Sequence, residues 1–112
     1  AAMKESNRVI FNRPAGAAKT PWLVELNESS ILAAEMGLAQ PPQSFATADT
    51  FLQWVQDQER DSRYFVLLVK PTTIETFSTI RKALQDRHFD VGYDLLPSDK
   101  TAIDAQTGAG VQ

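Results

Sequence analysis

The chain has 112 residues, of which 43% are apolar and 22% are charged, and it contains no cysteine. This length suits a single domain, and the composition excludes collagen-like, disulfide-framed, zinc-ribbon and wholly disordered proteins. A formal charge of −3 argues against a nucleic-acid binder, which would need a basic face.

The first half of the chain predicts strands. Residues 8–12 are a short candidate strand, and residues 14–18 are a loop of small residues. In the next strand, Trp22, Val24 and Leu26 alternate with Leu23 and Glu25, which places the two sets on opposite faces. The turn at 27–30 predicts a hairpin with a return strand over 31–36, although a short helix would also fit there. The adjacent prolines in residues 40–43 indicate a break.

A helix is predicted over residues 48–60. Thr47 is placed to cap its N-terminus, and Asp49 lies in the first turn, where a carboxylate meets the positive end of the helix dipole. Acidic residues near its other end oppose the dipole, so we expect the last turn to fray.

The second half predicts a strand–helix–strand unit. Residues 64–69 are apolar without alternation, which is typical of a strand covered on both faces. Thr72 and Glu75 have the spacing of a capping box that would open a second helix. The last strand follows over 89–96 and is closed by Pro97, and Gly92 within it suggests a bulge or a close backbone approach.

These elements predict an α+β fold in the order β-β-β-α-β-α-β. The crossover between the last two strands is long enough for parallel pairing. We expect a two-layer sandwich, with a mixed sheet of about four or five strands and both helices on one face. The expected organisation is a disordered N-terminus over 1–7, one domain over 8–97 and a disordered tail over 98–112, which has few large apolar residues.

No catalytic motif is present in the sequence. Glycine-rich phosphate loops and nucleophile elbows are absent. His88 is the only histidine, and it is read as the cap of the second helix. Glu25, Glu28 and Glu35 are read as solvated hairpin charges rather than as an acid–base pair. We therefore expect a protein that is not an enzyme and that uses neither a cofactor nor a metal.

The turn Lys70-Pro71-Thr72-Thr73 is the most distinctive local feature. A buried strand ends there and a helix begins, so a lysine and free backbone N–H groups would point to one space, as in the anion sites of α/β folds. Lys70, Thr72 and Thr73 are accordingly candidate ligand-binding residues. The simpler interpretation is a well-capped turn.

Charge is unevenly distributed along the chain. Residues 21–59 carry six acidic side chains and no basic one, whereas residues 60–87 carry six basic and three acidic side chains. Such blocks either attract each other within the fold or steer a charged partner. Trp22, Trp54 and Tyr93 are candidate interface residues. The two tryptophans are most simply core aromatics, and either of them would be an interface anchor if it were exposed.

The pattern from Trp22 to Pro97 resembles the periplasmic domain of the ExbD/TolR family. The likeness lies in the order of WLVELNESSIL, a helix containing DTFLQWV, the strand YFVLLVK, a helix with Ile74, Phe77, Ile80 and Leu84, and the closing strand VGYDLL. The resemblance implies a domain that follows one transmembrane helix, dimerises and contacts envelope partners without a cofactor. An acidic dipeptide of the family is replaced here by Lys70-Pro71, so no functional residue carries over. The series Lys-Pro, Phe-x-x-Ile-Arg and Gly-Tyr-Asp also resembles short bacterial proteins of unassigned function.

The functional prediction is a non-enzymatic protein-interaction domain, acting as the soluble part of a membrane-tethered bacterial assembly through a partner or a second copy. The alternative is a small-ligand or anion-binding domain that uses the Lys70–Thr73 turn. The resemblance implies a periplasmic location, and without it a cytoplasmic one is expected. The chain begins Ala-Ala-Met-Lys, which leaves open both a start at Met3 and an anchor further upstream.

Overall fold

The computed structural model describes residues 19–59 and 61–110, and the predicted strand at 8–12 lies outside them. The described elements are, in chain order, β1 (Thr20–Leu26), β2 (Ile31–Glu35), β3 (Gln43–Phe45), α2 (Ala48–Val55), β4 (Arg63–Val69), a 3-10 turn η1 (Pro71–Thr73), α3 (Ile74–Asp86) and β5 (Asp90–Leu95). They form the predicted α+β fold with a mixed sheet of five strands and two helices.

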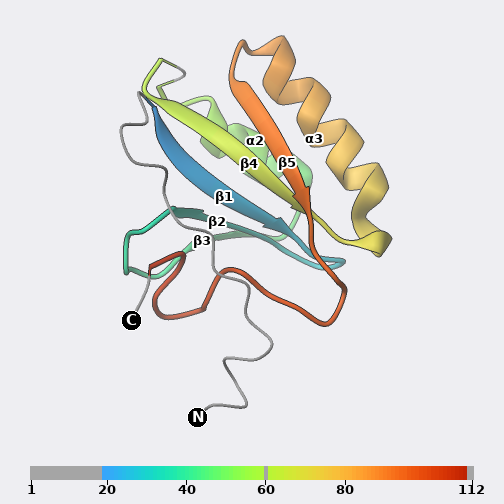
Figure 1. Ribbon diagram of the computed structural model, residues 1–112. Coiled ribbons are helices and arrows are strands. Elements are labelled where there is room, and N and C mark those ends of the chain that lie inside the picture. Colours follow the sequence, from blue (N-terminus) through green and yellow to red (C-terminus); the bar gives the residue numbers. More distant parts are fainter. Residues whose placement is uncertain (1–18, 60, 111–112) are drawn as a thin grey trace.

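The sheet has the strand order β3-β2-β1-β4-β5 (Figure 1). Antiparallel pairs join β1 to β2 and β2 to β3, whereas β1 pairs in parallel with β4 and β4 pairs in parallel with β5. The crossover through α3 therefore returns the chain beside β4, as the sequence predicted. In the register of this pair, Phe65 lies opposite Val91 and Leu67 lies opposite Tyr93.

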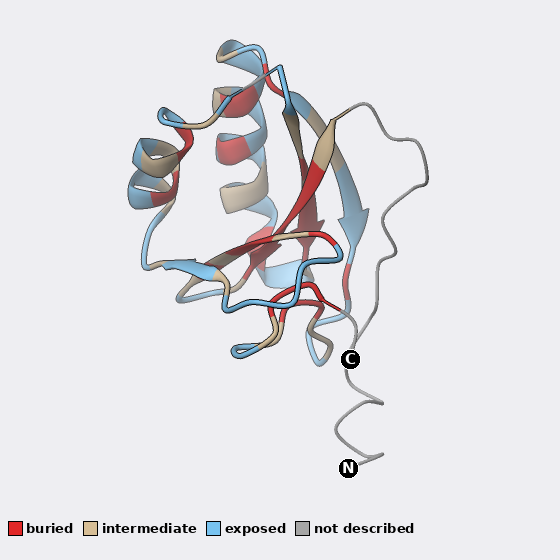
Figure 2. Ribbon diagram, turned by 90° about the vertical axis from the view of Figure 1, so that its left-hand side faces the viewer, coloured by how far each residue is buried: buried red, intermediate tan, exposed pale blue. Residues whose placement is uncertain are grey.

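One face of the sheet forms the main core with the two helices (Figure 2). Phe51 and Val55 of α2 and Ile80 and Leu84 of α3 are fully buried against Phe65 and its neighbours on the sheet. Burial of each such side chain contributes about 1.5–3 kcal/mol, which makes this face the main source of stability. Thr47 caps α2 as predicted, because its Oγ1 accepts the N–H of Thr50 at 3.2 Å.

The other face of the sheet is covered by the segment that follows β5. Residues 96–110, which we call the strap, lie across this face (Figure 1). Ala102, Ile103 and Ala109 of the strap are buried and pack in one cluster with Leu23 and Leu68. The sequence predicted a disordered tail over 98–112, but Ala102, Ile103 and residues 108–110 within it are buried, because these mostly small side chains fit closely against the sheet.

Several local expectations are corrected. The first helix ends at Val55 rather than at residue 60, since no basic residue in its last turn offsets the acidic residues beyond it. The third strand before that helix is β3, where the sequence indicated only a break. Gly92 makes no bulge, because it pairs in regular register with Val66 and an added Cβ would meet nothing within 4 Å.

The start of the second helix also differs from the prediction. A turn of 3-10 helix precedes α3, and Thr73 rather than Thr72 makes the capping bonds. The Thr73 hydroxyl accepts the Lys70 N–H at 2.9 Å and donates to the Lys70 carbonyl at 3.0 Å. Thr73 is therefore buried, whereas Thr72 is exposed.

Candidate functional site

The Lys70 turn lies at the end of β4, as the sequence predicted, but its ammonium group already has partners. Lys70 Nζ donates to Asn27 Oδ1 at 2.6 Å and lies 3.4 Å from Glu25 Oε2. Its side chain is only 11% exposed. The Thr73 N–H is also occupied, because it donates to the Lys70 carbonyl at 2.9 Å. Most of the groups that were expected to hold an anion are thus used within the fold.

A shallow polar cavity of about 330 Å³ opens beside this turn. Lys70, Thr72, Ser98 and the hairpin turn at residues 27–30 line it. The structure therefore brings two of the three predicted binding residues to one cavity, while Thr73 is buried and does not line it. The lining is made of hydroxyl, amide and charged groups, which suit a small polar ligand.

Glu25 was expected to be a solvated charge, and this expectation is wrong. The side chain projects from the central strand β1 onto the strap face of the sheet, and the residue is 2% exposed. Its Oε1 accepts the backbone N–H groups of Ala102 at 2.7 Å and Ile103 at 3.1 Å, and the Thr101 hydroxyl at 2.8 Å. A buried carboxylate is tolerated here because hydrogen bonds and the Lys70 ammonium compensate it.

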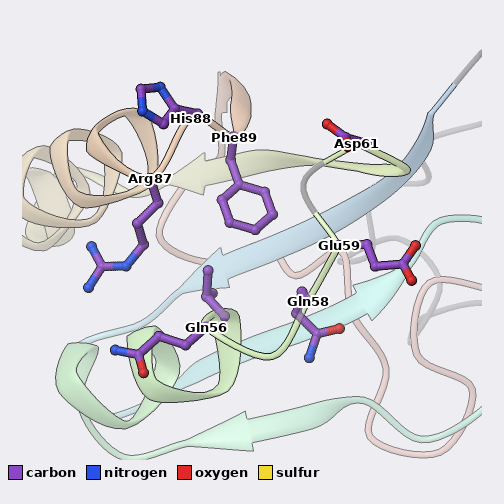
Figure 3. Close-up of a pocket in the computed structure, with 8 residues that line it drawn as sticks. Gln56, Gln58, Glu59, Asp61, Arg87, His88 and Phe89 are labelled. Atoms are coloured by element: carbon purple, nitrogen blue, oxygen red, sulfur yellow. The ribbon is translucent and has the colours of Figure 1, made fainter.

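A second cavity, of about 450 Å³, lies between the last turns of α2 and α3 (Figure 3). Its lining includes the buried residues Val55 and Phe89 and the exposed residues Glu59, Asp61 and His88. The carboxylates of Glu59 and Asp61 and the imidazole of His88 point away from one another (Figure 3). His88 also has a positive φ of 65°, and its N–H donates to Gln85 at 3.0 Å, so it closes the turn after α3. These groups do not converge on a point where a reacting atom would sit.

The described residues form neither a candidate metal site nor a candidate membrane-spanning helix. Within residues 19–59 and 61–110, no three histidine, cysteine, aspartate or glutamate side chains cluster to hold a metal ion. In the same part of the chain, no helix is long and apolar enough to span a bilayer.

Among the described residues, the most exposed large apolar side chains lie on β5 and at the start of α3. Tyr93 is 57% exposed and Leu95 is 73% exposed on this strand, and Ile74 at the start of α3 is 59% exposed. Leu95 and Ile74 lie at the same end of the sheet, because α3 begins where β4 ends and β5 runs parallel to β4 (Figure 1). We call Ile74, Tyr93 and Leu95 the edge patch.

Tyr93 is held in place from the helix side of the sheet. Its ring centroid lies 5.2 Å from that of Phe77, and the Arg81 guanidinium lies 5.8 Å from both ring centroids. Of the three residues predicted for an interface, only Tyr93 is exposed. Trp22 is buried and Trp54 is half-buried, with their ring centroids 5.4 Å apart in the main core. The tryptophans are therefore core residues.

The sequence missed Ile74 as a surface residue, since its spacing with Phe77, Ile80 and Leu84 placed it in the buried stripe of the helix. The 3-10 turn shifts the start of α3, and Ile74 stays outside the core.

No protein-family model, no curated protein and no solved structure matches this chain. The resemblance to the ExbD/TolR family therefore remains a prediction.

Proposed function

We propose that this chain is a non-enzymatic protein-interaction domain that pairs with a second copy through β5, as the soluble part of a membrane-tethered bacterial assembly. The observation that carries the pairing is the open edge of the sheet. Among the described residues, β5 hydrogen-bonds to β4 on one side only. An unpaired strand edge is a template for a further strand, and main-chain hydrogen bonds then supply the affinity.

β5 suits this role better than the opposite edge of the sheet. It has six residues, whereas β3 has three. β5 also carries two of the three residues of the edge patch, whereas β3 carries no exposed large apolar side chain. Patches of this kind on a small domain are typical of interaction surfaces.

The side chains of β5 favour one antiparallel register. Val91, Tyr93 and Leu95 alternate with acidic residues and glycine, so they share the helix face of the sheet. If Tyr93 faces the second copy's Tyr93, then Val91 faces Leu95 and Gly92 faces Asp94. Each facing pair then joins apolar to apolar, or an acid to a glycine.

Two other registers, centred on Gly92 and on Asp94, also keep the helices of both copies on the same face of the joined sheet. Both of them place acidic residues opposite each other. With Gly92 facing itself, Asp90 faces Asp94, and with Asp94 facing itself, two carboxylates meet directly. Like charges directly opposite each other destabilise a strand pair. Charge on β5 therefore selects the register centred on Tyr93.

A single introduced cysteine tests this register, because the chain has no cysteine of its own. In the Tyr93→Cys variant, the two sulfur-bearing residues would face each other at a Cα separation of about 4.5–5.5 Å, which a disulfide spans. We expect a covalent dimer under mild oxidation, seen on a non-reducing gel.

Leu95→Cys is the matched control. In the same register the two Leu95 positions are offset by four residues, or roughly 13 Å along the strand, which a disulfide cannot bridge. Equal cross-linking of both variants would contradict the register, and cross-linking of neither would contradict pairing through β5.

The membrane tether is supported by the family resemblance rather than by the geometry. It predicts that the natural reading frame encodes, upstream of Ala1, an apolar segment of about 20 residues that carries one acidic residue. Reading that coding sequence tests it, and translation starting at Met3 would contradict it.

The polar cavity beside Lys70 and Thr72 favours a second candidate function, the binding of a small anion. An anion would have to compete with Glu25 and Asn27 for the Lys70 ammonium. Phosphate, sulfate or acetate would then shift the amide resonances of Thr72 and Thr73 in a saturable way. Unchanged resonances at these residues would exclude this function.

A further inference from the structure

The strap is held to the sheet at its centre through its backbone. Glu25 accepts the N–H groups of two successive strap residues, Ala102 and Ile103. The Thr101 hydroxyl donates to the same carboxylate and also lies 3.2 Å from the Ile103 carbonyl. A carboxylate that binds consecutive backbone N–H groups recognises a peptide chain by its main chain.

The far end of the strap fits the sheet because its residues are small. Gly108 has a φ of +60°, and an added Cβ would lie 2.3 Å from the Gln40 carbonyl oxygen. At Gly110, an added Cβ would lie 2.4 Å from Ala39 Cα. Ala109 is buried between them, and its carbonyl accepts the Gly37 N–H at 3.1 Å. The surface therefore selects alanine and glycine at these positions.

The strap also contains a turn that is held by its own residues. It forms no helix or strand of its own beyond a tight turn, in which Asp104 and Gly108 exchange two backbone hydrogen bonds of 2.9 Å. The Asp104 carboxylate accepts the N–H groups of Gln106 and Thr107, which stabilises that turn internally. Within the strap, the exposed residues Pro97 to Asp99 separate Leu96, which directly follows β5, from the part that begins at Thr101.

We infer that the strap face of the sheet is a peptide-binding groove that residues 101–110 occupy in cis. Its ligand class is a short peptide that presents two successive backbone N–H groups to Glu25 and small side chains near Ala39 and Gln40. A strap supplied from another molecule would make the same contacts. This inference does not depend on pairing through β5.

A cut chain tests the inference. A recognition sequence for a site-specific protease is inserted between Ser98 and Asp99 of the full chain, which is folded and then cleaved. A fluorescent synthetic peptide of residues 101–112 is added in excess, and its uptake is followed by anisotropy. We expect the labelled peptide to replace the cleaved strap.

Replacing one backbone amide of the peptide by an ester tests the hydrogen bond to Glu25 separately from the other contacts. In one peptide the N–H of Ala102 is replaced by an ester oxygen, which removes the donor and leaves the side chains unchanged. Loss of one hydrogen bond to a buried charge predicts about ten- to hundredfold weaker binding. The control peptide carries the ester at Ala105, an exposed residue, and we expect it to bind like the unmodified peptide.

Equal binding of the two ester peptides would overturn the inference, because the groove would then not recognise the main chain through Glu25. Failure of the labelled peptide to exchange, or unfolding of the chain on cleavage, would overturn it as well, since the strap would then be an inseparable part of the core.

Discussion

Glu25 is the residue whose replacement has the most informative consequence. In Glu25→Gln, the side chain keeps its size and one oxygen, but the negative charge is lost. The retained oxygen still accepts the N–H groups of Ala102 and Ile103, now as a neutral acceptor. The new NH₂ group replaces Oε2, which lies 3.4 Å from Lys70 Nζ, so a donor faces a donor.

The expected loss follows from these contacts. Hydrogen bonds to a charged acceptor contribute about 1.5–3 kcal/mol each, roughly twice as much as neutral ones, and Glu25 accepts three from the strap. Weakening them together, with the ion pair removed, predicts a loss of about 2–3 kcal/mol in the free energy of unfolding. Lys70→Met leaves the Glu25 carboxylate buried without its cation, and removal of one partner of a buried ion pair predicts a loss of about 3 kcal/mol or more.

Urea unfolding measures both losses, and hydrogen exchange at the amides of Ala102 and Ile103 shows whether the strap is the part that loosens. Glu28→Gln is the control, since Glu28 is an exposed glutamate on the neighbouring turn. A Glu25→Gln variant within about 0.5 kcal/mol of the unmodified protein would contradict this role of Glu25, and an equally stable Lys70→Met variant would contradict the role of the ion pair.

Further predictions concern backbone positions and the turn before α3. Gly108→Ala would place a Cβ against the Gln40 carbonyl at a positive φ, so we expect a loss of about 2 kcal/mol or more by urea unfolding. Gly92→Ala, with open space at that position, would leave the stability within about 0.5 kcal/mol, and a large loss would contradict the open geometry. Thr73→Val removes the hydroxyl that is hydrogen-bonded to the Lys70 backbone, so we expect the free energy of unfolding to fall by about 1–3 kcal/mol. An unchanged midpoint of urea unfolding would contradict this capping role of Thr73.

The helix face of the sheet was predictable because its residues are large and regularly spaced. Alternation placed Trp22 and Val24 on one face, and Phe51 and Val55, one helical turn apart on α2, pack against that face. The capping threonine at 47 fixed the start of that helix. These signals are local, so one sequence is sufficient to read them.

The strap was missed because its contacts are made by small residues and by backbone groups. Alanine and glycine carry little apolar area, so a segment rich in them looks unable to fold. One signal did point to it: residues 64–69 are apolar on both faces, and the helices can cover only one of these. The sequence therefore required a second cover, and residues 96–110 provide it.

The partners of Lys70 were beyond sequence reasoning. Lys70 was placed at the end of a strand and beside a helix start, and both features are present. Its ammonium contacts Glu25 and Asn27, which lie 45 and 43 residues away in the chain. Such long-range pairing depends on the parallel register of β1 and β4, which brings the ends of these strands together.

The most direct test of the proposed function is the mass of the unmodified chain in solution. Light scattering over a concentration series, extended to millimolar protein, measures whether two copies associate. We expect a concentration-dependent dimer that Leu95→Lys weakens and that Leu38→Lys, a change at an exposed apolar residue outside the edge patch, leaves intact. A strict monomer at millimolar concentration would contradict it.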